Sequence, residues 1–177
     1  MNRFRSFVIP AMGAMVALLV TSTVAMAQSD EATAPATPAG ATIAAAITIV
    51  HTAHLNFGQI VAGVGAGTVA QTAGASPTRT ATGCTLGNAT GMTPATFTVG
   101  GEPNATYAIT LPDDVTVTLT GAGDPMAVTD FVSSPVGTGT LSGGGLQTLY
   151  VGATLNVGAA QVAGVYTGTF DVTVTYN

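Results

Sequence analysis

The stretch that most limits how this chain can fold is its closing one, residues 164–177. From Tyr166 to Tyr176 the even positions are aromatic or β-branched apart from one glycine, whereas the odd positions are threonine and one aspartate. Because successive side chains of a strand face opposite sides of a sheet, this period of two predicts a strand with one buried and one hydrated face. Its residue types also favour a pleated backbone over a helix. The buried face of this closing strand is expected to consist of Tyr166, Phe170, Val172, Val174 and Tyr176.

Shorter alternating stretches recur upstream, separated by Gly, Pro, Asn and Asp and without a convincing helix. Many short strands at intervals of about ten residues indicate an all-β sandwich. The alternation over 43–57 is longer than a usual strand, so we interpret it as two strands, near 42–50 and 53–61. The further expected strands are 68–71, 95–100, 105–111, 115–120, 126–132, 138–142, 146–151 and 154–157.

The N-terminus has the pattern of an export signal. Arg3 and Arg5 precede an apolar run over 7–20, and small residues follow at 25–27. This predicts a secretory signal peptide over 1–27; the alternative, a retained anchor helix, is disfavoured by the polar residues that follow. The mature protein is then expected in the periplasm, at the cell surface or outside the cell, with no membrane span after cleavage.

After the signal, composition divides the chain again. Residues 28–41 are rich in Pro, Ala and Thr without apolar periodicity, which predicts a flexible linker. Residues 42–177 are then expected to form a single β-sandwich domain.

Charge excludes some partners. Beyond the predicted signal, Arg79 is the one basic residue that remains against eight acidic ones. Such a chain cannot neutralise phosphates, which argues against nucleic acid as a partner. Charged residues make up 6% of the chain, far below the usual quarter or so. Threonine-rich faces do little to discourage association between sheet edges, and this surface suits an assembling protein.

Few residues could carry chemistry. The two histidines, His51 and His54, are separated by an odd offset, so on a strand they would face opposite sides and could not share a metal unless the backbone bends there. Cys84 is the one cysteine, so no intramolecular disulfide can form. We interpret it as a small buried hydrophobic residue, the alternative being a reactive or intermolecular thiol.

The remaining motifs are weak. A loose dinucleotide-type glycine pattern over 65–70 has no acidic residue at the required distance, and no serine lies in a nucleophile elbow. Asn88 and Asn104 begin glycan-acceptor triplets of a kind expected by chance in a threonine-rich chain. Asp113, Asp114, Asp124 and Asp130 are better explained as turn residues than as calcium ligands. We therefore expect no catalytic, cofactor-binding or metal-binding residues, and no enzyme activity.

Several segments together resemble a known family. They are Leu55-Asn-Phe-Gly-Gln-Ile60, Phe97-Thr-Val-Gly-Gly101, Tyr107-Ala-Ile-Thr-Leu-Pro112, Val151-Gly-Ala-Thr-Leu155 and the closing stretch 164–177. This combination resembles the DUF4402 family of exported bacterial domains, whose function is uncharacterised. More distantly, the ending is similar to the terminal strand of chaperone–usher pilus subunits. In those, an incomplete immunoglobulin-like sandwich receives a strand from the next subunit. Many pilins carry a disulfide, which this chain cannot form.

The resemblance implies an exported structural subunit of a cell-surface or fimbria-like assembly, joined by β-strand donation, with a role in adhesion or biofilm. Its partners would be other copies or related subunits, and a periplasmic chaperone. Residues 42–50 would be the N-terminal donor strand, with an interface formed by Ile43, Ala45, Ile47 and Ile49. The alternative is a self-contained secreted sandwich that binds a ligand or glycan through its loops. An open hydrophobic groove together with an undocked arm over residues 28–50 would favour the first. A complete sandwich with that arm docked in its own sheet would favour the second.

Overall fold

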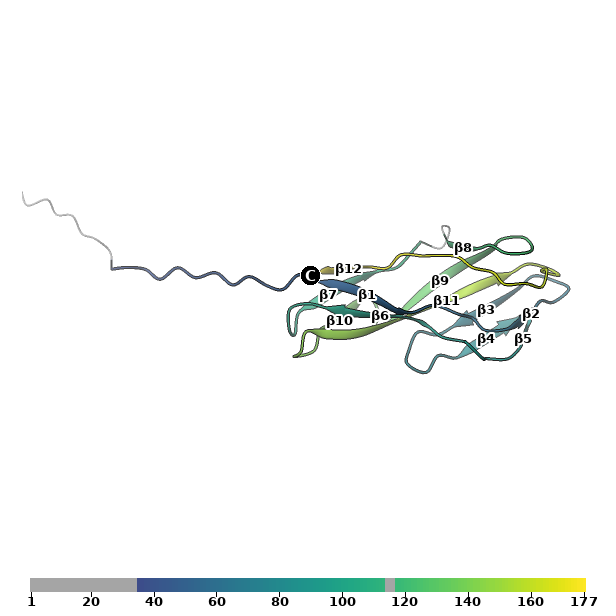
Figure 1. The fold of residues 1–177 in the computed structure, drawn as a ribbon, viewed down its shortest axis with the longest axis horizontal. Coiled ribbons are helices and arrows are strands. Elements are labelled where there is room, and N and C mark those ends of the chain that lie inside the picture. The colour runs from purple at the N-terminus through teal and green to yellow at the C-terminus, as the bar shows by residue number, and fades with distance from the viewer. Residues whose placement is uncertain (1–34, 114–116) are drawn as a thin grey trace, which may run out of the picture. The chain divides into compact units, whose positions relative to one another are not determined.

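A computed structural model describes residues 35–113 and 117–177. Within these ranges all regular elements are strands, which confirms the predicted all-β fold (Figure 1). None of the described residues forms a helix able to cross a membrane. The predicted signal peptide, residues 28–34 of the predicted linker, and Asp114 lie outside the described ranges. The strands are β1 (Thr48–Ala53), β2 (Ile60–Val61), β3 (Gly67–Gln71), β4 (Arg79–Thr82), β5 (Thr85–Leu86), β6 (Ala95–Gly100), β7 (Thr106–Thr110), β8 (Val117–Leu119), β9 (Met126–Ser134), β10 (Thr138–Thr140), β11 (Leu146–Val157) and β12 (Thr173–Tyr176).

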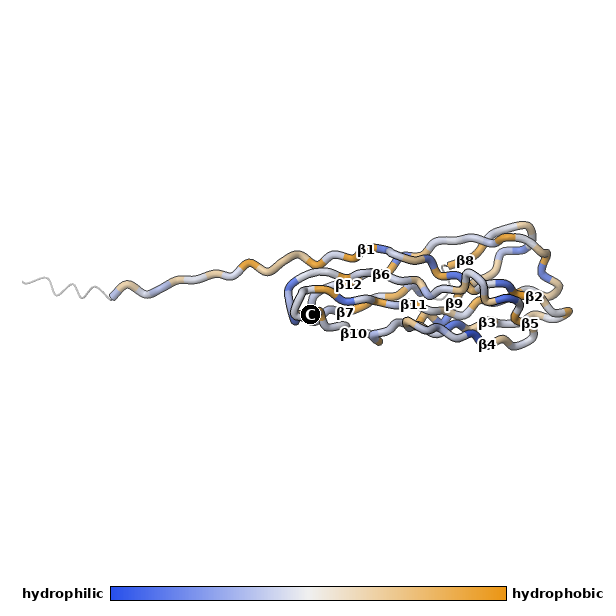
Figure 2. Tube along the Cα trace, turned by 60° about the horizontal axis from the view of Figure 1, so that its bottom comes forward, coloured by the Kyte–Doolittle hydropathy of each residue, from blue (hydrophilic) through white to orange (hydrophobic). Residues whose placement is uncertain are grey.

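Residues Thr42–Asn177 form one compact unit. Residues 35–41 carry no strand and are exposed. Figure 2 shows how few stretches of the trace are strongly hydrophilic, as the 6% of charged residues requires.

The long strand β11 organises the largest sheet, which has seven strands in all. One edge of β11 pairs first with β6 and then with β3, while its other edge pairs with β9. The outer strands β1, β4 and β8 extend this sheet through β6, β3 and β9. A second sheet has the order β10-β7-β12, and β2 pairs with β5 in a small third one. All these pairings are antiparallel.

The core lies between the sheets in two clusters. Along β11 the odd residues from Leu149 to Val157 are buried, as the period of two requires. The first cluster consists of Phe57, Val69, Val117, Met126, Val128, Ala153, Leu155 and Val157. The second consists of Ala95, Phe97, Val99, Tyr107, Leu141, Leu149 and Val151. Because the second cluster draws on both larger sheets, these sheets pack face to face as a sandwich.

Several expected strands occur with small changes in their bounds. The strand predicted over 95–100 is β6, and that over 68–71 is β3. The two strands expected over 146–157 are one continuous strand, β11. Two short strands, β4 and β5, lie between the expected strands 68–71 and 95–100, where no strand was predicted, because half of their residues are threonine and they carry little hydrophobic signal.

The beginning of the domain differs from the prediction. Residues 42–47 have no regular structure, and β1 pairs with β6 of its own chain. The ladder shifts register between His51 and Ala53. Beyond it, Gly58 has a φ of 71° and donates its N–H to Asn56 Oδ1, forming a tight turn. These two irregularities replace the expected strand over 53–61 with one bridge, from Asn56 to Thr93, and the short β2.

The closing strand is also shorter than expected. Only residues 173–176 are a strand, although Thr167 forms a bridge with Thr120. The side-chain alternation nevertheless persists from 170 to 176, with even residues partly buried and odd residues exposed. The backbone hydrogen bonds of this stretch are few, because it pairs only with Thr120 at one bridge and with β7 along residues 173–176.

Candidate functional site: an unclosed apolar groove

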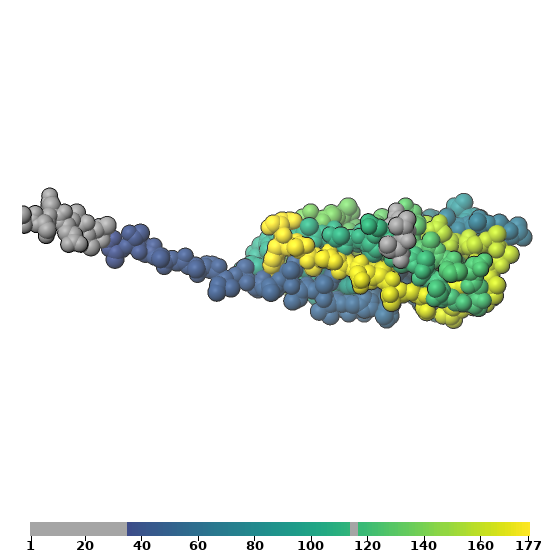
Figure 3. All heavy atoms as spheres, turned by 90° about the horizontal axis from the view of Figure 1, so that it is seen from above, coloured from purple at the N-terminus to yellow at the C-terminus, as the bar shows by residue number. Residues whose placement is uncertain are grey.

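A groove of about 1080 Å³ opens on one face of the domain. Its two sides are formed by residues 54–62, here called the first rim, and residues 160–170, called the second rim. Figure 3 shows the closing part of the chain (yellow) running beside the first part of the domain (blue) on one face. The groove therefore lies where the beginning and the end of the domain meet.

The floor of the groove is the first core cluster. Val117, Val128 and Leu155 are at most 5% exposed, yet they line the groove together with Met126 and Val157. No Asp, Glu, Lys or Arg is found among the described residues that line it. Such a surface accepts an apolar, uncharged occupant and penalises a charged one.

The first rim is held from its outer side. β2 pairs with β5, and Gln59 donates its N–H to Asn88 O at 3.1 Å. The Arg79 guanidinium donates to the carbonyls of Phe57, Gln59 and Gly87. The lone cation of the described residues is thus used to fix the rim rather than to bind a ligand.

The second rim is likewise bonded on one side only. Thr167 and Thr120 exchange two backbone hydrogen bonds, of 2.9 and 3.0 Å. Among the described residues, the nearest backbone hydrogen bond across the groove runs from Ala160 N–H to Gly63 O, just beyond the end of the first rim. Apart from β2 and the bridges at Asn56 and Thr167, the two rims form no strand, and no ladder joins them across the groove.

The same seam continues beyond the groove. β1 extends the first rim and β12 the second, and the two strands lie in contact. Among the described strands, β1 pairs only with β6, and β12 only with β7. No backbone ladder therefore joins the first segment of the domain to the last one, either at the groove or between β1 and β12.

At the far end of this seam, side chains link the leading segment, residues 42–47, to β12. The Tyr176 hydroxyl accepts a hydrogen bond from Glu102 N–H at 2.6 Å and donates one to Ala45 O at 2.8 Å. Ala45 N–H donates to Glu102 Oε2 at 2.9 Å. This Tyr176 latch holds the leading segment at one residue, without a strand ladder. Sequence patterns did not indicate it, because Tyr176 had been assigned only to the core.

The predicted donor residues fall into two pairs. Ile43 is 95% exposed and Ala45 is also exposed. Ile47 and Ile49 are partly buried and pack against the second core cluster of their own chain. The interface predicted over 42–50 is therefore not one continuous exposed face.

The predicted closing-strand residues are all partly buried. Tyr166 packs against the first cluster, and Val172, Val174 and Tyr176 against the second. Phe170 contacts both clusters, and its ring centre lies 5.0 Å from that of Phe131. Tyr166 and Phe170 also line the groove. The residues 160–165 that complete the second rim were not predicted, because they have no apolar period.

The two histidines meet the exception that was stated for them, a bend of the backbone. His51 and His54 were expected on opposite faces, but their ring centroids are 4.6 Å apart. The register shift at the end of β1 is the bend that brings them together.

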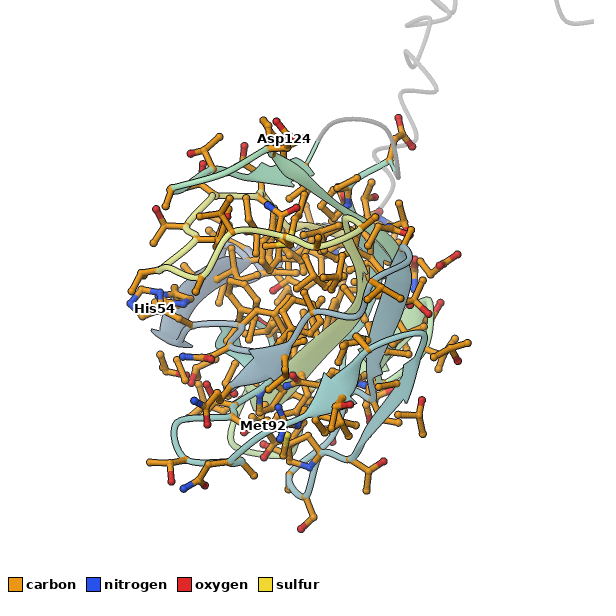
Figure 4. The ribbon with its side chains drawn as sticks, turned by 90° about the vertical axis from the view of Figure 1, so that its right-hand side faces the viewer. His54, Met92 and Asp124 are labelled. Atoms are coloured by element: carbon orange, nitrogen blue, oxygen red, sulfur yellow. The ribbon has the colours of Figure 1, made fainter. Side chains whose placement is uncertain are left out.

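The other sites considered from the sequence lie elsewhere. The thiol of Cys84 donates to Thr68 O at 3.4 Å and packs against the first cluster, with intermediate exposure. Asp124 lies apart from His54, which belongs to the first rim (Figure 4). No group of three or more potential metal ligands occurs among the described residues.

Comparison with known proteins gives one match. Residues 47–176 match a family model described as a domain of unknown function, DUF4402. No curated protein and no solved structure matches the chain. The matched region contains both rims and the floor of the groove, and it begins after Ile43 and Ala45.

Proposed function

The chain belongs to the DUF4402 family, and we propose that it is an exported structural subunit of a cell-surface or fimbria-like assembly. A β-strand from a neighbouring copy enters the groove and closes the sandwich. Adhesion or biofilm structure is the role of such an assembly. Related subunits are further partners, and a periplasmic chaperone covers the groove before assembly.

The observation that carries this proposal is the unclosed seam above the first core cluster. Its volume of about 1080 Å³ is at the upper end of small-molecule pockets, which hold roughly 300–1,000 Å³. Each side is hydrogen-bonded to its own outer neighbour rather than to the other side, so a strand that enters between them has two backbone segments with which to form hydrogen bonds. Its floor is apolar, and a strand with an apolar face would bury it.

The proposed occupant is the leading segment of a second copy. Ile43 is almost fully exposed in its own chain, and exposed isoleucine stabilises nothing there. The segment carries no charge, which matches the uncharged lining of the groove.

The donor strand should end near residue 46. Ile47 and Ile49 pack against their own core, so donating them would expose that part of the core. Proline cannot donate to a ladder, so Pro38 sets the other limit. Residues 39–46 remain, with the alternating set Ala39, Ala41, Ile43 and Ala45 facing the groove floor. Donation of Ala45 requires release of the Tyr176 latch.

A matched pair of substitutions tests the proposal. Ile43→Asp places a charge on the face that enters the groove, whereas Thr42→Asp places the same charge on the opposite face of the donated strand. Both residues are exposed in the free subunit, so neither change should affect folding. Light scattering over a concentration series should show assembly for the wild type and Thr42→Asp, and a monomer for Ile43→Asp.

A peptide separates loss of donation from loss of the groove. The Ile43→Asp protein keeps an intact groove and should bind a synthetic peptide of residues 39–46. The same peptide with aspartate at position 43 should not bind. Strand donation is rejected if the wild type stays monomeric at all concentrations and binds neither peptide.

A second candidate is a self-contained sandwich that binds a ligand or glycan through its loops. The pairing of β1 with β6 within one chain favours it. In that case the wild type stays monomeric, and the groove rims, with Asn56, Gln59 and Thr167, are the first place to look for ligand-dependent shifts in NMR spectra.

A further inference from the structure

The end of β1 brings the two histidines of the chain together. His51 lies opposite Phe97 in the ladder, and the register shift that follows allows His54 to turn back to the same side. Their ring centroids are 4.6 Å apart, with an angle of 43° between the ring planes. Both side chains are exposed, so solvent and ions reach them.

This separation matches the geometry of two imidazoles on one metal ion. A metal–nitrogen distance of about 2.0–2.1 Å places each ring centre roughly 3.2 Å from the metal. Two such rings at 90° have centres about 4.5 Å apart, and at a tetrahedral angle about 5.2 Å apart. The observed 4.6 Å is close to the 90° arrangement of a square-planar or octahedral ion.

The backbone around the pair is anchored on both sides. The His51 ring packs edge-on against Phe97, with ring centroids 5.4 Å apart. The carbonyl of His54 accepts a hydrogen bond from Thr93 Oγ1 at 2.7 Å, and Asn56 exchanges backbone hydrogen bonds with the same threonine. Arg79, the basic residue of the described chain, is engaged by three carbonyls. The backbone that carries the two imidazoles is thus held in place, so less backbone freedom is lost when they bind a metal.

We propose that His51 and His54 form a two-histidine site for a divalent transition-metal ion, with Cu²⁺ and Ni²⁺ preferred over Zn²⁺. Imidazole suits all three ions, and the order of intrinsic affinity and the 90° geometry both favour Cu²⁺. Because no third potential ligand clusters with the pair among the described residues, the other coordination positions are open to water or to a donor from another molecule. The proposal does not depend on strand donation.

The test uses isothermal titration of the protein with Cu²⁺, Ni²⁺ and Zn²⁺ salts. Cys84→Ser in every protein removes the thiol as a competing ligand and reductant. We expect one Cu²⁺ per chain, with weaker binding of Ni²⁺ and Zn²⁺, and at least a tenfold loss of Cu²⁺ affinity in His51→Ala and in His54→Ala. Electron paramagnetic resonance of the Cu²⁺ complex should show coupling to two imidazole nitrogens.

A rearranged variant is the matched control. Val50→His combined with His54→Thr keeps two histidines but places them on opposite faces of β1, because the ladder is regular at residues 50 and 51. It should bind Cu²⁺ no better than either single-histidine variant. The site is refuted if this variant binds as tightly as the parent protein, if either alanine variant keeps the parent affinity, or if the parent protein binds no stoichiometric Cu²⁺.

Discussion

Removing the hydroxyl of Tyr107 tests how the second core cluster is held together. Tyr107 on β7 is fully buried, and its hydroxyl donates to Gln147 Oε1 at 2.8 Å. The ring lies over Gly139 of the paired strand β10, where an added Cβ would collide with it. In Tyr107→Phe the ring keeps its place, and only the hydrogen bond is lost. Such a bond contributes about 0.5–1.5 kcal/mol, and Gln147 is partly exposed, so water can satisfy its freed oxygen. We expect a loss of about 1 kcal/mol in the free energy of unfolding at neutral pH.

The same substitution should change how stability depends on pH. Burial raises the pKa of the Tyr107 hydroxyl above its ordinary value of 10.0. The protonated hydroxyl is therefore favoured by folding, and its contribution is fully present below about pH 10. It is lost as the pH rises from there through the raised pKa of the folded state. Phenylalanine cannot ionise, so this part of the alkaline decline should be absent from the variant.

Urea unfolding at pH 7 and at intervals up to pH 11 would measure both effects. In thermal unfolding at pH 7, the melting temperature of the variant should be lower than that of the wild type by about 3–5 °C. Tyr150→Phe is the control, because Tyr150 is only partly buried on β11. The reasoning fails if both variants lose equal stability, or if Tyr107→Phe keeps the alkaline decline of the wild type.

Further predictions concern the core, the rim and the termini. Phe170→Ala should lower the free energy of unfolding in urea by about 2–4 kcal/mol, because it removes a ring that contacts both clusters. Thr173→Ala on the exposed face should change it by no more than about 0.5 kcal/mol. Equal losses in the two variants would contradict the alternation of buried and exposed residues. Arg79→Gln should speed amide hydrogen exchange in the first rim, since the guanidinium donates to two of its carbonyls; unchanged exchange would show that the rim is held without it. Gln71→Met should raise the free energy of unfolding by about 1 kcal/mol, because the buried Gln71 amide has no hydrogen-bond partner among the described residues. A lower free energy of unfolding in this variant would contradict the prediction. N-terminal sequencing of exported protein should begin near Gln28, and a chain that still starts with its first residue would refute the signal peptide.

The fold was predictable where burial and local pattern agree. The alternation over 95–100 predicted β6 because its side chains pack against the second cluster on one face. The same reasoning identified the buried side of residues 170–176, although only part of that stretch forms a ladder. A period of two reports which side chains are buried, but not whether a partner strand lies beside the backbone.

The candidate sites were not predictable in the same way. Residues 160–165 of the second rim have no apolar period in the sequence. Only their position opposite the first rim in the folded chain identifies them as part of the groove. The histidine pair depends on a shift in register between His51 and Ala53, which side-chain pattern does not encode. The Tyr176 latch joins residues that are far apart in sequence, and it needed the folded chain to be seen.

The Tyr176 latch also determines how the domain would carry mechanical load. Tension applied through the leading segment reaches Ala45 before it reaches β1, so the first bonds to be strained are those to Tyr176 and Glu102. These few side-chain hydrogen bonds rupture more easily than the antiparallel ladder between β1 and β6. Their release frees the backbone as far as Ile47, whose side chain still packs against the second cluster, and each freed residue spans about 3.3–3.6 Å at most. A subunit under tension would thus extend slightly at low force through its leading segment, and then resist further extension through the β1–β6 ladder.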